Sequence, residues 1–198
     1  MDLIILYISN MLPTVFVGFI IYMLARIIYV KKTQKSVGIV REFWLCIFVV
    51  YMIALLSQTV IPSYQFGIDS MTGEFFFYVN MENANASVNL IPFNSLREFF
   101  VENNSVDGWG NVAVLNILAN LLFFVPLGFL IPLLWEKLRP FKKVLLISFL
   151  ITLFIEIIQY FIGRSSDIDD IMLNVAGSIL GYGIYILVSK FLARKSNT

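Results

Sequence analysis

Long apolar runs alternate with short polar segments along the chain. Each run approaches the roughly 20 residues that a helix needs to cross about 30 Å of hydrocarbon. The runs are continuous rather than alternating, which favours helices over a transmembrane barrel. Asn10 and Pro13 interrupt the first run, so we start its span near Leu12. The pattern predicts five spanning helices, at about residues 12–30, 43–61, 112–135, 144–162 and 171–189.

The basic residues predict how these spans are oriented. Under a five-span topology, 12 of the 14 lysines and arginines share one side, and the remaining two are Arg97 and Arg164. Lys and Arg near span ends are retained in the cytoplasm. We therefore predict a five-helix transmembrane bundle with the N-terminus outside, the C-terminus cytoplasmic and one long outer loop between the second and third helices. An even number of spans would break this charge partition.

Composition narrows the class of protein further. Of the residues, 59% are hydrophobic and 14% are charged, whereas about a quarter are charged in a soluble domain. The chain has no histidine, which removes the commonest zinc ligand and the usual general base. The single cysteine, Cys46, lies in an apolar run and excludes a disulfide framework. We predict an all-α, multi-pass protein of the cell membrane, with no cofactor, no metal and no nucleic-acid partner.

The outer loop, residues 62–111, contains patterns of its own. Residues 73–79 predict a strand, and residues 87–91 predict a return strand that would complete a hairpin with it. Ser95, with Glu98 three residues later, matches a capping box at the start of a short amphipathic helix. The apolar side chains of that helix would lie in the plane of the membrane interface: Leu96, Phe99 and Phe100.

Polar side chains from three predicted spans share one depth near the outer face. Glu156 lies six residues below the outer end of the fourth span, which is about 9 Å at the helical rise. A carboxylate that faced lipid would be costly, so we expect Glu156 to face the bundle. The band consists of Asn116, Asn120, Glu156, Gln159, Asp170 and Asn174.

A short polar loop, residues 163–170, joins the fourth span to the fifth and adds charged groups. Arginine binds phosphate with two parallel hydrogen bonds, so Arg97 and Arg164 suit a headgroup, and we expect one of them to fold over Glu156. The D-I-D-D sequence offers hard oxygen ligands but lacks the spacing and glycine of a calcium loop. The predicted ligand-binding pocket comprises Arg97, Asn116, Asn120, Glu156, Gln159, Arg164, Asp167, Asp170 and Asn174. The structural alternative is that amides bridge helices and the loop is an ordinary wet loop.

Two glycines, Gly177 and Gly181, continue the Asp170–Asn174 face of the fifth helix. A Gly-x-x-x-Gly pattern lets a second helix approach closely. We therefore predict that a neighbouring helix packs against this face.

Taken together, several of these segments resemble the VanZ-like family. They are N-L-I-P-F at 89–93, N-I-L-A-N-L-L-F-F-V-P-L-G at 116–128, Glu156-x-x-Gln159, Arg164, Asp167-x-x-Asp170, Asn174, Gly177 and Gly181. The resemblance covers about residues 45–187. It implies a VanZ-like membrane domain at residues 43–190, preceded at residues 1–42 by an extra transmembrane helix and a basic cytoplasmic loop.

The family resemblance also implies a role. The family is named for a small membrane protein that accompanies glycopeptide-resistance genes and raises resistance to teicoplanin, a lipoglycopeptide. It does so without the altered peptidoglycan precursor that defeats vancomycin. Such proteins are widespread in Gram-positive bacteria. The resemblance therefore implies a protein that modulates glycopeptide susceptibility, with a lipoglycopeptide as one candidate partner.

Three functions remain open at this point. The first is an accessory protein that binds a membrane lipid or a lipid-linked cell-wall precursor by its headgroup at the outer leaflet. The second is an intramembrane enzyme with Glu156 and Asp170 as acid and base, although no G-x-S-x-G, H-E-x-x-H or Walker sequence is present. The third is a transporter, which predicts polar residues along the whole bundle. The inner halves of the last three spans offer little beyond Ser178, Tyr182 and Tyr185.

Overall fold

The computed structural model describes residues 3–34, 38–80, 87–98 and 109–196. In this part of the chain five helices are long and apolar enough to cross a membrane, which confirms the predicted fold class. The long helices are α1 (Leu3–Thr33), α2 (Ile39–Thr59), α4 (Trp109–Leu134), α5 (Phe141–Phe161) and α6 (Ile168–Ser196). The short elements are β1 (Ser63–Ile68), β2 (Phe75–Asn80), β3 (Val88–Asn89), α3 (Asn94–Arg97), the 3-10 helix η3 (Glu136–Leu138) and β4 (Ser166–Asp167).

The chain forms two compact units. Unit 1 contains residues 1–86 and 161–164, and unit 2 contains residues 87–160 and 165–198. Unit 1 therefore holds α1, α2, β1 and β2, while the remaining helices and strands belong to unit 2.

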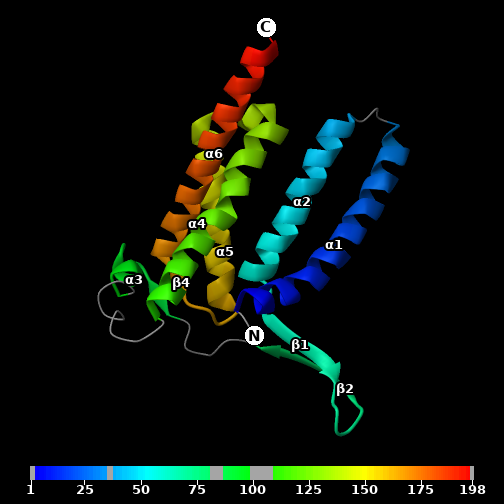
Figure 1. The fold of residues 1–198 in the computed structure, drawn as a ribbon, viewed down its shortest axis with the longest axis vertical. Coiled ribbons are helices and arrows are strands. Elements are labelled where there is room, and N and C mark those ends of the chain that lie inside the picture. The colour runs from blue at the N-terminus through cyan, green and yellow to red at the C-terminus, as the bar shows by residue number, and fades with distance from the viewer. Residues whose placement is uncertain (1–2, 35–37, 81–86, 99–108, 197–198) are drawn as a thin grey trace. The chain divides into compact units, whose positions relative to one another are not determined.

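In unit 1, α1 and α2 form an antiparallel pair (Figure 1). The part of α1 that is apolar enough to span a membrane begins at Met11, close to the predicted start near Leu12, although the helix itself begins earlier and continues through Pro13. A proline removes a single backbone donor, whereas a helix broken inside hydrocarbon would leave several polar backbone groups unsatisfied. Gly18 lets α2 approach, since a Cβ added there would lie 2.8 Å from Cδ1 of Ile53.

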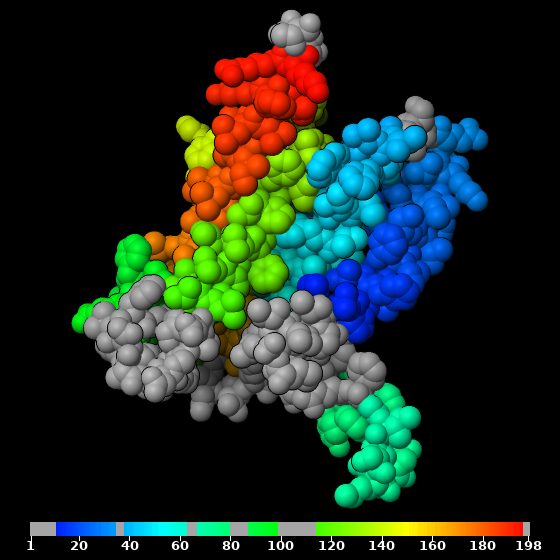
Figure 2. Space-filling view, in the orientation of Figure 1, coloured from blue at the N-terminus to red at the C-terminus, as the bar shows by residue number. Residues whose placement is uncertain are grey.

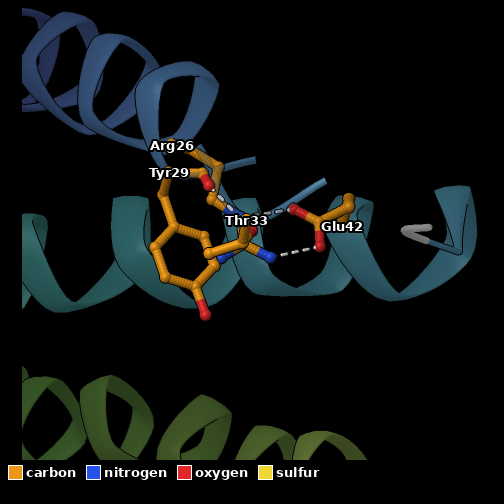
Figure 3. A network of polar contacts seen from close by, with 4 residues as sticks. All are labelled: Arg26, Tyr29, Thr33 and Glu42. Carbon is orange, nitrogen blue, oxygen red and sulfur yellow. Dashed lines mark hydrogen bonds and ion pairs between the residues drawn. The ribbon is translucent and has the colours of Figure 1, made fainter. Parts of the chain in front are cut away.

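A bidentate ion pair joins the C-terminal part of α1 to the N-terminal end of α2 (Figure 3). Arg26 donates from Nε and Nη2 to the two carboxylate oxygens of Glu42, at 2.7 and 2.5 Å. The guanidinium carbon also lies 5.2 Å from the centre of the Tyr29 ring. Two parallel hydrogen bonds between ionised groups are a strong, geometrically specific contact, so this pair fixes the register of the two helices.

The hairpin in unit 1 has a different partner strand from the one predicted. β2 pairs antiparallel with the preceding strand β1, and not with residues 87–91. The turn explains this choice, because the Asp69 carboxylate accepts two backbone N–H groups and Gly73 adopts a left-handed φ of 72°. A turn at this position closes the chain backward onto residues 63–68. Figure 2 shows the hairpin projecting beyond the end of α2.

In unit 2, α4 and α6 run parallel to each other and pack at backbone distance. A Cβ added to Gly177 or Gly181 of α6 would overlap a backbone carbonyl oxygen of α4. Gly128 of α4 is equally close to the backbone of Ser178 on α6. The prediction that a neighbouring helix lies against the Gly-x-x-x-Gly face is confirmed, and the close approach uses glycines from both helices.

The core of unit 2 is formed by side chains from α4, α5 and α6. Its buried apolar side chains are Phe124, Leu127, Leu130, Ile131, Leu134, Val144, Ile155 and Tyr185. α6 has 29 residues, or about 43 Å at the helical rise, which exceeds the thickness of the hydrocarbon layer. Its last turns, which carry Lys190, Arg194 and Lys195, extend beyond α4 (red in Figure 2).

Candidate functional site

The site begins where α6 begins. Asp167 immediately precedes the helix, and its carboxylate accepts the backbone N–H of Asp169 at 2.9 Å. This is the geometry of an N-cap, which satisfies one of the donors left free at a helix start. α6 therefore begins at Ile168, three residues before the predicted start of the span. On the other side of the loop, Gly163 with φ 85° allows the chain to leave the end of α5.

A short parallel β pairing brings the outer-loop segment to this helix start. β3 pairs with β4, with Val88 opposite Ser166 and Asn89 opposite Asp167. The N–H of Ser166 also donates to the carbonyl oxygen of Ser87 at 3.0 Å. Residues 87–91 were predicted to be the return strand of a hairpin, but Val88 and Asn89 of this segment pair instead with residues 78 positions later in the chain.

Asp169 fixes the next part of the same segment. Its side chain is 2% exposed, and its two carboxylate oxygens accept the N–H groups of Phe93 and Leu96 at 2.6 and 3.2 Å. Phe93 adopts a left-handed conformation with φ 64° and ψ 9°, which is strained for a residue with a side chain. Leu96 is half-buried, while Phe99 and Phe100, also assigned to the interface plane, lie outside the described residues.

The predicted capping box is therefore wrong. α3 begins at Asn94 without a side-chain cap of its own, and Ser95 lies inside it. The Ser95 hydroxyl donates to Asp167, whereas Glu98 accepts the Asn94 amide at 2.9 Å. The Asn89 amide lies 3.0 Å from Oγ of Ser95 and 3.4 Å from both carboxylate oxygens of Asp167. The hydrogen bonds that the capping box would have made within α3 are replaced by hydrogen bonds to Asp167 and Asp169 at the start of α6.

Glu156 supports the arrangement from α5. Its side chain is buried, as predicted, with 3% exposed, and its Oε2 accepts the N–H of Asp167 at 3.0 Å. Three helices and a loop segment thus converge on four acids, which we call the carboxylate cluster: Glu156, Asp167, Asp169 and Asp170.

The predicted amides occupy different environments. The Asn120 side-chain amide on α4 donates to Oδ1 of Asp170 on α6. Asn174 is 3% exposed, and its Oδ1 has no hydrogen-bond partner among the described residues. Gln159 is half-buried on α5, whereas Asn116 is exposed on α4. The structure thus joins Asn120, Asp170 and Asn174 at the α4–α6 contact and leaves Asn116 outside it.

The two arginines belong to different units. Arg97 is exposed on α3 in unit 2. Arg164 belongs to unit 1, where its guanidinium lies 3.4 and 3.3 Å from the carbonyl oxygens of Gln58 and Thr59 at the end of α2. Arginines suit a helix C-terminus, where free carbonyls carry partial negative charge. A pairing of either arginine with Glu156 stays a prediction.

Some residues of the site were missed in the sequence. The 87–97 segment is held to α6 through Asn89, Ser95 and Asp169. The sequence signal that could have indicated these contacts is the presence of both N-L-I-P-F-N-S and D-I-D-D in one chain. Two further buried polar residues, Ser148 and Thr152, were not singled out either, and they lie deeper on α5 than the carboxylate cluster. Both are fully buried on α5, and with Glu156 they follow one face at intervals of four residues.

Fold and site together define a multi-pass helical membrane protein in which buried carboxylates tie a loop segment to the end of a three-helix unit. The chain belongs to the VanZ/LLP1 family, whose model matches residues 48–189. The VanZ family is associated in general with teicoplanin resistance. The matched range contains the whole carboxylate cluster and the 87–97 segment. Searches among curated proteins and solved structures found no match to the chain.

Proposed function

We propose that this protein is an accessory membrane protein that binds a polar headgroup at the carboxylate cluster. The headgroup belongs to a membrane lipid or to a lipid-linked cell-wall precursor, and its binding lowers the susceptibility of the cell to teicoplanin. The observation that carries the proposal is a set of buried polar side chains at one end of α4, α5 and α6. Each of them is at most 3% exposed: Glu156, Asp169 and Asn174.

The position of the cluster supports a ligand at the membrane surface. Polar groups buried inside a transmembrane bundle are costly and mark functional sites. The distribution of basic residues predicts that this end of the helices faces outside, where cell-wall precursors and lipoglycopeptides meet the bilayer. The orientation is part of the proposal.

Binding is favoured over catalysis by the hydrogen bonds of the two candidate catalytic acids. Glu156 holds the N–H of Asp167, and Asp170 holds the amide of Asn120. A general acid or base must exchange its proton with a substrate, and carboxylates that position the backbone and a neighbouring helix are less free to do so. An enzyme remains the alternative, and turnover of a lipid-linked substrate by the purified protein would establish it.

The test is the expression of the full chain in a teicoplanin-susceptible Gram-positive strain. We expect the wild-type protein to raise the minimal inhibitory concentration of teicoplanin and to leave that of vancomycin unchanged. Glu156→Gln keeps an oxygen that can accept the Asp167 N–H but removes the charge, so we expect normal protein levels and no resistance. The proposal fails if the wild-type chain does not change teicoplanin susceptibility, or if Glu156→Gln retains full resistance.

A further inference from the structure

Three acids of the carboxylate cluster, Glu156, Asp167 and Asp169, accept their hydrogen bonds from neutral donors. Glu156 accepts a backbone N–H, Asp169 accepts two, and Asp167 accepts a backbone N–H, a hydroxyl and an amide. Asp167 and Asp170 also lie within electrostatic range of Glu156. Neutral donors satisfy hydrogen bonds without adding a positive charge, and like charges at short range repel each other. A positively charged ligand would relieve this repulsion.

An unsatisfied acceptor points to the same place. The Asn174 residue is only 3% exposed, yet its Oδ1 has no hydrogen-bond partner among the described residues. Buried polar atoms without a partner are uncommon and call for an explanation. Helical side chains tilt toward the N-terminus of their own helix. The Asn174 amide therefore lies over the turn that contains Asp170, four residues earlier on the same face.

The acceptor is also held in position. Asp170 is joined to α4 through Asn120, and Gly177, three residues beyond Asn174, packs against the backbone of Leu121 on α4. Asn174 thus lies between two fixed points of contact. The backbone that carries Asn174 cannot move away from this site without separating α4 from α6.

We propose that Asn174, Asp170 and Glu156 form a binding site for a protonated primary amine in the headgroup of a membrane lipid. An ammonium group offers three N–H donors and one positive charge, which matches an amide oxygen beside two carboxylates. The inference rests on the proposed function and deepens it, since it assigns the amine, rather than the phosphate, as the recognised part of the headgroup.

The test uses the full-length protein in phosphatidylcholine nanodiscs that contain a minor fraction of one probe lipid. The probes are phosphatidylethanolamine, N-acetyl-phosphatidylethanolamine and phosphatidylglycerol, and the lipid retained by the protein is measured by native mass spectrometry. All three carry a phosphate, but only the first carries an ammonium. We expect about tenfold stronger retention of phosphatidylethanolamine, as for the gain of a charged hydrogen bond. Competition by free ethanolamine in water shows whether the amine alone is sufficient.

Variants locate the site. We expect Asp170→Asn and Asn174→Leu each to reduce retention of phosphatidylethanolamine to the level of phosphatidylglycerol. Ser148→Ala is the matched control, because Ser148 also has a buried oxygen without a partner in the described part of the chain, but lies two turns deeper than Glu156. It should retain the lipid normally. The melting temperature in pure phosphatidylcholine nanodiscs identifies a variant that does not fold. If Asn174→Leu does not fold, the result for Asp170→Asn alone tests the site.

Each outcome bears on a different claim. Equal retention of phosphatidylethanolamine and phosphatidylglycerol overturns the amine site but leaves headgroup binding intact. An equal loss in Ser148→Ala overturns the assignment to the Asp170 turn. If the protein retains no probe lipid and also leaves teicoplanin susceptibility unchanged, both this inference and the proposed function are wrong.

Discussion

Asp169 determines more of the site than any residue that was predicted for it. It is buried at the first turn of α6, and each of its oxygens accepts a backbone N–H from the segment that contains α3. Its bond to Phe93 also holds that residue in its left-handed conformation. A carboxylate at a helix N-terminus is favoured by the helix dipole, so Asp169 is stabilised by its own helix while it organises another segment.

Replacing Asp169 by alanine should release this segment. Two backbone N–H groups would lose their acceptor, at a cost of about 1–3 kcal/mol for each group that stays buried. We expect a lower melting temperature in detergent and faster tryptic cleavage after Arg97, which is exposed on α3. Asp69→Ala is the matched control, because Asp69 also accepts two backbone N–H groups but in the exposed turn of the β1–β2 hairpin. Similar losses in both variants would contradict the role given to Asp169.

At the scale of elements, the pair of parallel helices α4 and α6 is the rigid part of unit 2. Glycines on both helices permit backbone contact, and Ser178 donates from its hydroxyl to the carbonyl oxygen of Phe124 at 3.3 Å across the same interface. In a membrane, helices associate through close packing and hydrogen bonds of this kind rather than through the hydrophobic effect. The contact sets the distance between Asn120 and Asp170, and hence the width of the proposed amine site.

Alanine substitutions should distinguish the packed glycines from a free one. Ala favours a helix over Gly by about 1 kcal/mol, so a glycine with open space should gain stability. Gly183 has nothing within 4 Å of an added Cβ, whereas Gly177 and Gly181 face the α4 backbone. We expect Gly177→Ala and Gly181→Ala to lower the melting temperature in detergent and Gly183→Ala to leave it equal or higher. The same response at all three positions would contradict the assigned helix contact.

The sequence predicted elements better than the contacts between distant segments. The five helices and the Gly-x-x-x-Gly contact depend on hydropathy and on local spacing, and both are visible in a window of one or two turns. The partners of residues 73–79 and 87–91 depend on which turn closes first and on acceptors 78 positions away, which no local pattern contains. For the same reason only part of the site could be predicted. Glu156, Asp167 and Asp170 could be recognised as acids near membrane spans, whereas the roles of Asn89 and Ser95 depend on their contacts with the distant Asp167.

At the scale of the whole molecule, the orientation in the membrane determines whether the site can meet a cell-wall ligand. Unit 2 has its carboxylate cluster at one end and the exposed Arg139–Glu136 ion pair of η3 at the other. The distribution of basic residues predicts that the η3 end lies in the cytoplasm. Every outward-facing feature of the proposed function depends on this assignment.

Cysteine labelling on intact cells tests the orientation. In a Cys46→Ala background, Met71→Cys in the hairpin turn should react with a membrane-impermeant maleimide, because Met71 is 96% exposed. Glu136→Cys should react only after the cells are permeabilised, although the Glu136 side chain is 81% exposed. Exposure at both positions ensures that a missing reaction reports the side of the membrane rather than burial. The reverse pattern would invert the topology and remove the proposed headgroup from the outer leaflet.

The β3–β4 pairing also has a consequence for biosynthesis. β3 is synthesised 78 residues before its partner, so α4 and α5 must both be synthesised before Asp167 and Asp169 exist to receive it. Until then the 87–97 segment lacks both its strand partner and its carboxylate acceptors. Insertion of α6 is thus the step that completes the site, and a chain that ends before residue 166 should insert α4 and α5 yet leave this segment open to protease.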